Sequence, residues 1–140
     1  MVTICTFDNP NEYMAYSAKE KVGFISQVQS PFLYLYNYFL YGKDSVKSAS
    51  DFLKNTTVPT MIIEASNDET IPKQCGIISH CSNFQNKNII KNTITTDRLN
   101  SHNTIWLSET TKSDNKTSLN INFSFFDKIL NFYNNSIAVK

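Results

Sequence analysis

Hydrophobic positions in this chain fall into short β-branched runs separated by longer stretches with helical spacing. The short runs predict strands over residues 2–7, 58–63 and 88–96. The run at 58–63 is apolar at consecutive positions, as expected for a strand that is covered on both faces of a parallel sheet. The order strand, helices, strand, helix, strand, helix predicts an α/β fold with a three-stranded parallel sheet flanked by helices.

The stretches between these strands carry apolar residues every three or four positions, which predicts helices. We expect them over residues 11–28, 31–41, 45–54, 72–81, 103–109 and 120–137, with a polar insert at 112–117. Pro31 suits the first turn of the second helix, and Gly42 suits its carboxyl-terminal cap. Ser45 suits the cap of the third helix. Gly23 weakens the first helix, which can therefore divide into two pieces.

The stretch 32–41 is rich in aromatic residues and is apolar on nearly every face of a helix. Such a helix is either buried on all sides or lines an apolar pocket. In the first interpretation its aromatic residues are ordinary core packing. In the second, Phe32, Tyr36 and Phe39 line a pocket for an apolar or acyl substrate.

Composition narrows the classes of function. The chain has 140 residues and a net charge of +1, so no basic field favours nucleic acid or an anionic membrane. No apolar run approaches the length of a membrane span. Cys5, Cys75 and Cys81 lack the spacing of a disulfide framework, which favours free thiols and a cytoplasmic location. Cys75, His80 and Cys81 match no standard zinc-ligand spacing, so we expect no metal and no cofactor.

Two titratable residues follow predicted strands. Asp68 comes just after the strand at 58–63, in a turn sequence, and His102 comes after the strand at 88–96. Because functional groups collect where the carboxyl ends of parallel strands meet, we expect these two side chains to lie close together. A carboxylate that accepts a hydrogen bond from one imidazole nitrogen orients the ring and leaves the other nitrogen to act as a base.

The motifs around these two residues resemble the carboxyl-terminal half of an α/β-hydrolase. They are Val58-Pro-Thr-Met-Ile-Ile63, Asn67-Asp68, Ile71-Pro72 and Ser101-His102-Asn103. The likeness is greatest to bacterial serine hydrolases of the monoacylglycerol-lipase or serine-aminopeptidase type. It implies that Asp68 is the acid and His102 the base of a serine triad, in that chain order. It also implies an ester or amide substrate with an apolar acyl part.

The resemblance covers most of the chain and implies one partial domain over residues 1–140. Residues 11–54 correspond to cap-like and connecting helices, and residues 58–140 to the units that carry the acid, the base and the last helix. The nucleophile is missing, because none of the glycines Gly23, Gly42 and Gly76 brackets a serine as G-x-S-x-G requires. Cys5 lies on a predicted strand, where we expect it to be buried packing.

We therefore expect the chain to be inactive alone. A strand at residues 2–7 with no further neighbour would expose an apolar edge. We expect the chain to bind an amino-terminal half-protein, to self-associate, or to be only marginally folded. Three interpretations stay open. The chain is part of a truncated or split serine hydrolase, a non-catalytic interaction module derived from one, or an unrelated α/β binding domain. The last requires Asp68 and His102 to lie far apart.

Overall fold

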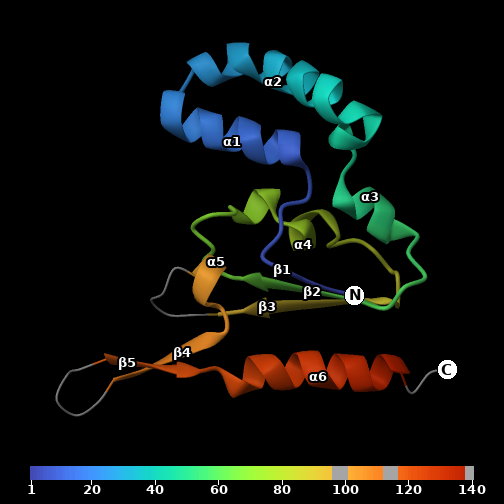
Figure 1. Cartoon of the computed structure of the whole chain (residues 1–140), viewed down its shortest axis with the longest axis vertical. Coiled ribbons are helices and arrows are strands. Elements are labelled where there is room, and N and C mark those ends of the chain that lie inside the picture. Colours follow the sequence, from blue (N-terminus) through green and yellow to red (C-terminus); the bar gives the residue numbers. More distant parts are fainter. Residues whose placement is uncertain (96–100, 112–116, 138–140) are drawn as a thin grey trace.

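The computed structural model describes residues 1–95, 101–111 and 117–137 (Figure 1). Its central sheet consists of β1 (Val2–Ile4), β2 (Thr60–Ala65) and β3 (Ile89–Ile94). The three strands are parallel and β2 lies in the middle, where Met61 pairs with Val2 on one side and Ile90 on the other. The predicted three-stranded parallel sheet flanked by helices is confirmed.

Strand β2 is buried on both faces because its alternate residues enter two different cores. Ile63 lies in a cluster with two phenylalanines of α6 (Phe123–Ile137), whereas Ile62 lies in a cluster that includes Leu53 of α3 (Ala49–Lys54) and Ile77 of α4 (Ile77–His80). Both isoleucines are 0% exposed. Helix α6 therefore covers one face of the sheet, while α3 and α4 cover the other (Figure 1).

A hairpin of two longer helices, α1 (Pro10–Val22) and α2 (Ile25–Tyr41), extends beyond α3 and α4 (Figure 1). The expected boundary before Pro31 is wrong, because Pro31 lies inside α2. The chain turns instead at Gly23, whose φ of 59° is accessible to glycine at little cost. Helix α1 begins after Asn9, whose side-chain oxygen accepts a hydrogen bond from the backbone N–H of Asn11 at 2.9 Å.

Two of the predicted helices are shorter and interrupted. The region 45–54 divides into the 3-10 helix η1 (Gly42–Val46) and α3, because Lys47 and Ser48 are extended. The region 72–81 divides into η2 (Lys73–Cys75) and α4, because Gly76 between them is extended.

The predicted helix over 103–109 is wrong. Helix α5 (Ser101–Thr104) is short, and an antiparallel hairpin of β4 (Leu107–Thr111) and β5 (Thr117–Ile121) follows it. These strands are rich in threonine, which suits a pleated surface better than a helix. Helix α6 consequently begins at Phe123 rather than at 120. Residues 112–116 of the predicted insert lie outside the described residues.

Two further features of the fold concern its exposed edge and its helices. Strand β1 lies at the edge of the sheet, and Ile4 at its end is 39% exposed. No helix in the described ranges has the length and apolarity needed to cross a membrane.

Candidate active site

Asp68 and His102 meet at the carboxyl edge of the sheet. Asp68 lies in the turn after β2, and His102 lies in α5, which follows β3. His102 Nδ1 is 2.9 Å from Asp68 Oδ2, although the residues are 34 positions apart in the chain. The predicted proximity of these two side chains is therefore observed.

The two carboxylate oxygens of Asp68 have different partners. Oδ1 accepts hydrogen bonds from the backbone N–H groups of Thr70 and Ile71, both at 2.8 Å. This is the turn-forming role common for aspartate. Oδ2 is directed to His102, and the Asp68 side chain is only 7% exposed, compared with 24% for that of His102. The backbone thus holds the carboxylate in place while its second oxygen orients the imidazole ring.

Cys5 is a third member of this group, although its place in the strand predicted over residues 2–7 indicated only buried packing. It lies just beyond β1, at the same edge, and is 6% exposed. Ligand atoms of Cys5, Asp68 and His102 all lie within 4.8 Å of one another. Its burial was predicted correctly, but its proximity to the pair was not. The signal was available, because a residue that follows the first parallel strand must reach the same sheet edge as the residues after the other two.

The backbone at Cys5 has a positive φ of 46°, which no other non-glycine residue in the described part of the chain shows. The Cys5 N–H donates to the carbonyl of Ile63 at 2.8 Å and so holds this conformation. The pKa of the Cys5 thiol is raised to about 11, chiefly by burial and also by the nearby negative charges of Asp68 and Glu64, against a lowering by the Ala65 backbone.

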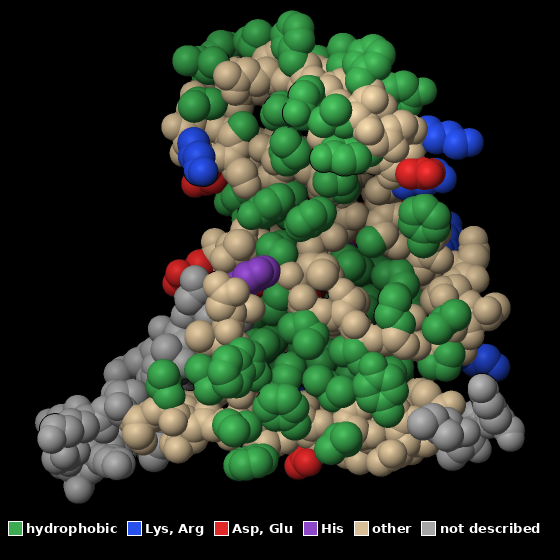
Figure 2. All heavy atoms as spheres, in the orientation of Figure 1, with side chains coloured by type: hydrophobic (Ala, Val, Ile, Leu, Met, Phe, Trp, Pro, Cys, Tyr) green, Lys and Arg blue, Asp and Glu red, His purple; other side chains and the backbone are tan. Residues whose placement is uncertain are grey.

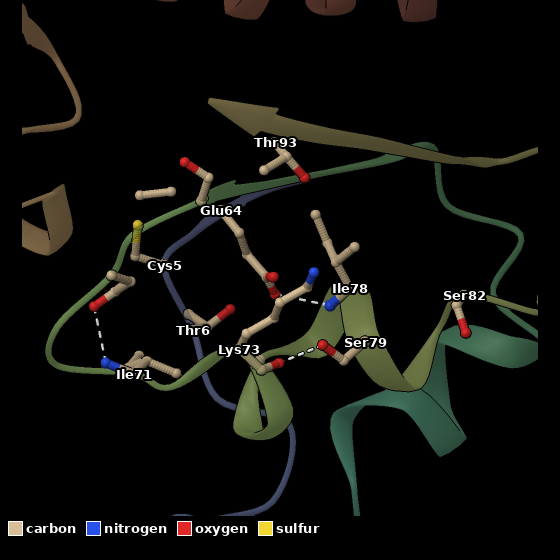
Figure 3. Close-up of a pocket in the computed structure, with 13 residues that line it drawn as sticks. Cys5, Thr6, Glu64, Ile71, Lys73, Ile78, Ser79, Ser82 and Thr93 are labelled. Carbon is tan, nitrogen blue, oxygen red and sulfur yellow. Dashed lines mark hydrogen bonds between the residues drawn. The ribbon is translucent and has the colours of Figure 1, made fainter. Parts of the chain in front are cut away.

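A cavity of about 250 Å³ adjoins the group and is lined by Cys5, Asp68 and Glu64, among others. Cys5 lies at one end of the cavity, and Ser79 and Ser82 lie toward the other (Figure 3). This volume is slightly below the roughly 300 Å³ at the lower end of typical ligand pockets. The cavity therefore suits an ion or a small organic group.

Glu64 belongs to β2, and its side chain lines one wall of this cavity. Burial raises the pKa of its carboxyl group, whereas a hydrogen bond from the Ile78 N–H, at 2.7 Å to Oε1, lowers it. A Cβ atom at Gly76 would lie 2.9 Å from both Glu64 carboxylate oxygens. Glycine at this position therefore allows the carboxylate to lie against the backbone.

The three residues predicted to line an acyl pocket lie on the exposed surface of α2 in the described part of the chain. Phe32, Tyr36 and Phe39 are 68%, 59% and 81% exposed, and none of them lines a cavity described here. Core packing does not account for them either. They belong to an apolar surface that extends over the helical hairpin (Figure 2).

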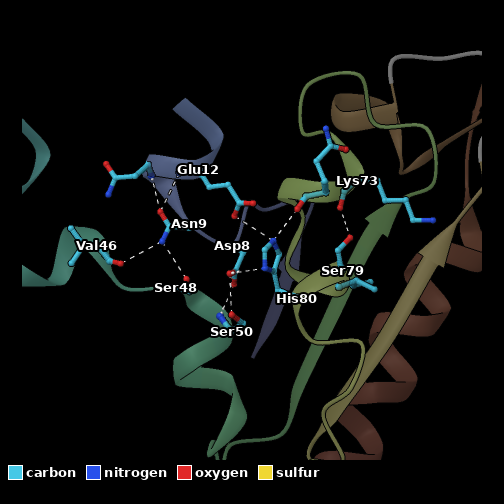
Figure 4. A network of polar contacts seen from close by, with 12 residues as sticks. Asp8, Asn9, Glu12, Val46, Ser48, Ser50, Lys73, Ser79 and His80 are labelled. Carbon is cyan, nitrogen blue, oxygen red and sulfur yellow. Dashed lines mark hydrogen bonds and ion pairs between the residues drawn. The ribbon is translucent and has the colours of Figure 1, made fainter. Parts of the chain in front are cut away.

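A second polar cluster joins the helices to the sheet (Figure 4). His80 Nδ1 is 3.6 Å from the buried carboxylate of Asp8, and His80 Nε2 is 3.4 Å from Glu12. The Asp8 carboxylate also accepts hydrogen bonds from Ser50. These bonds connect the end of the first strand segment to α1, α3 and α4, so the cluster serves the fold. It does not bring His80 together with Cys75 and Cys81 as a ligand group among the described residues.

A scan against models of protein families found no match, and searches of curated proteins and of solved structures found none either.

Proposed function

We propose that Asp68 and His102 are the acid and base of a hydrolytic acyl-transfer site that acts on an ester or amide with an apolar acyl part. The observation that carries this proposal is the 2.9 Å contact between His102 Nδ1 and an Asp68 carboxylate whose other oxygen is held by two backbone N–H groups. A carboxylate in this position orients the ring and stabilises the imidazolium that forms during acyl transfer.

The chemistry needs a nucleophile next to His102 Nε2. This nitrogen would take the proton of a serine hydroxyl while the serine oxygen attacks the substrate carbonyl, and would then give that proton to the leaving group. Water would release the acyl group by the same route in reverse. Because the sequence lacks G-x-S-x-G, the serine has to come from another polypeptide segment.

The edge of β1 is where that segment would attach. Exposed edge strands present unpaired backbone groups to which another strand can add. The proposed partner is an amino-terminal half-protein that carries the serine, with a second copy of this chain as the other candidate. The cysteines Cys5, Cys75 and Cys81 are free thiols, which supports a reducing location such as the cytoplasm.

The test is labelling of the assembled complex with a fluorophosphonate, which reacts with activated serines. A tagged chain should co-purify with a polypeptide that the probe labels. His102→Ala should abolish the labelling and Asp68→Asn should reduce it by at least about tenfold, since loss of the orienting acid has large effects in triads. His80→Ala is the matched control, because this histidine lies in the other cluster.

Labelling that is indifferent to His102→Ala would refute the role of His102 as the base. Robust ester turnover by the pure chain, abolished by His102→Ala, would show instead that no second segment is needed. The turnover assay uses small activated esters and the reduced chain of residues 1–140.

The exposed apolar surface of α2 supports a second candidate, a non-catalytic interaction module derived from a hydrolase. Phe32 and Phe39 are among its most exposed side chains. Contiguous apolar patches on a protein surface commonly mark interaction sites. In this case Phe39→Ser would weaken partner binding, while His102→Ala would change neither binding nor any activity of the complex.

A further inference from the structure

We propose that Cys5, Asp68 and His102 form a binding site for a divalent transition-metal ion of the zinc class. The site shares two residues with the proposed acyl-transfer pair but does not depend on that function. It adds a thiol that the acyl-transfer mechanism does not use.

The positions of the ligand atoms carry the proposal. A sulfur, a carboxylate oxygen and an imidazole nitrogen lie within 4.8 Å of one another. Zinc bonds of about 2.0–2.3 Å in a tetrahedron place neighbouring ligand atoms roughly 3.3–3.8 Å apart. The group would therefore contract by about 1 Å at its widest separation. The 2.9 Å contact between Asp68 and His102 would lengthen slightly as the ion enters.

The three residues come from different parts of the sheet. Cys5 follows β1, Asp68 follows β2, and His102 lies in the short helix after β3. Side chains that converge from three strand ends are held by the fold rather than by local sequence. The two backbone hydrogen bonds to Asp68 Oδ1 are the kind of outer contact that orients a metal-binding carboxylate.

The backbone of Cys5 provides an independent observation. A positive φ at a non-glycine residue costs on the order of 1 kcal/mol or more, and such conformations cluster at functional sites. Plain packing of a small apolar side chain would not require the 46° value found here. This conformation occurs at Cys5, directly after β1, where the thiol lies next to Asp68 and His102.

The charges around the group also favour a cation. Asp68 and Glu64 line the same cavity as Cys5, and Lys73 is the basic residue on its wall. When the ion binds, the thiol proton passes to solvent and the sulfur binds as thiolate. Thiolate and imidazole ligands favour zinc over magnesium or calcium. With three protein ligands, the fourth position is left for water or a small anion.

The experiment is a cobalt(II) titration of the reduced, metal-stripped full-length chain, followed by competition with zinc. We expect one equivalent to bind and to produce the near-ultraviolet absorption of a cobalt–thiolate bond. Cys5→Ser should abolish that absorption, and Asp68→Asn and His102→Ala should each weaken binding by at least about tenfold. Cys75→Ala should leave it unchanged, since this thiol lies outside the group.

X-ray absorption of the zinc-loaded wild-type chain gives a readout that needs no variant. One sulfur in the first shell together with nitrogen or oxygen ligands is the expected result. Two sulfurs, or no saturable binding by the folded chain, would overturn the metal site. Fluorophosphonate labelling of the metal-free complex separates the two proposals. His102→Ala should abolish that labelling and Cys75→Ala should leave it intact, since this thiol lies outside the group. The acyl-transfer proposal therefore stands or falls without any metal present.

Discussion

The buried carboxylate of Asp8 is the contact whose removal should destabilise this fold most clearly. Asp8 is 3% exposed and follows the first strand. Its Oδ1 accepts the Ser50 backbone N–H at 2.6 Å, and its Oδ2 accepts the Ser50 hydroxyl at 3.0 Å. The Asp8 backbone carbonyl also accepts the Ala49 N–H at 2.8 Å, so the residue holds the start of α3 against the sheet (Figure 4).

The magnitude follows from these bonds. A hydrogen bond to a charged group contributes roughly 1.5–3 kcal/mol, and a buried N–H left without a partner costs about 1–3 kcal/mol. The substitution also removes the free-energy cost of burying a charged carboxylate, which offsets part of this loss. We therefore expect Asp8→Ala to lower the free energy of unfolding by about 3 kcal/mol. For a chain of this size, that change corresponds to a decrease in Tm of roughly 10 °C.

The assay is urea denaturation followed by far-ultraviolet circular dichroism. Asp8→Asn is the matched control, because its amide oxygen can still accept the Ser50 N–H, and we expect a loss of only about 1 kcal/mol. A double-mutant cycle with Ser50→Ala should give a coupling energy of at least about 0.5 kcal/mol, since these residues are in direct contact. A change of less than about 0.5 kcal/mol in Asp8→Ala would refute the argument, because surface positions already reach that value.

Three further predictions concern buried groups. Gly76→Ala should destabilise the chain by about 1–2 kcal/mol in urea, because the new Cβ displaces a Glu64 carboxylate bonded to the Ile78 N–H; unchanged stability would show that the carboxylate moves freely. Burial raises the pKa of Glu64 above its unfolded value, so its protonated form stabilises the fold at low pH and this contribution is lost as pH rises through the raised pKa. Glu64→Gln should therefore gain stability relative to wild type as pH rises above the ordinary range of a carboxyl group, and parallel pH profiles would contradict this. Burial also raises the pKa of Cys81 to about 11, and its side chain is 0% exposed. We expect a thiol reagent to modify Cys81 only after unfolding, and rapid modification in native buffer would oppose its burial.

The central sheet and the approach of Asp68 to His102 could be predicted because both depend on local pattern and chain order. The apolar run at 58–63 indicates a strand that is covered on both faces of the sheet. Because the strands are parallel, the residues that follow them lie at the same edge of the sheet. That reasoning applied equally to Cys5. The residue pattern predicts a first strand that extends to residue 7 and so contains Cys5, whereas β1 ends at Ile4 and Cys5 follows it.

Two features could not be predicted from local sequence. One depends on pairing between strands, and the other on two helix-ending residues that lie close together in the chain. The hairpin of β4 and β5 is stabilised by cross-strand pairs such as Leu107 with Ile121, which no local window contains. Gly23 and Pro31 both signal the end of a helix, and the structure places the turn at Gly23.

The sequence by itself determined where strands alternate with helices and which carboxylate and imidazole share an edge, because periodicity and connectivity are properties of the chain alone. Only the tertiary structure decided that the Cys5 thiol joins that pair, through a backbone conformation held by a hydrogen bond to β2. It also decided that the aromatic face of α2 is exposed, because an apolar helix is buried only where another element covers it.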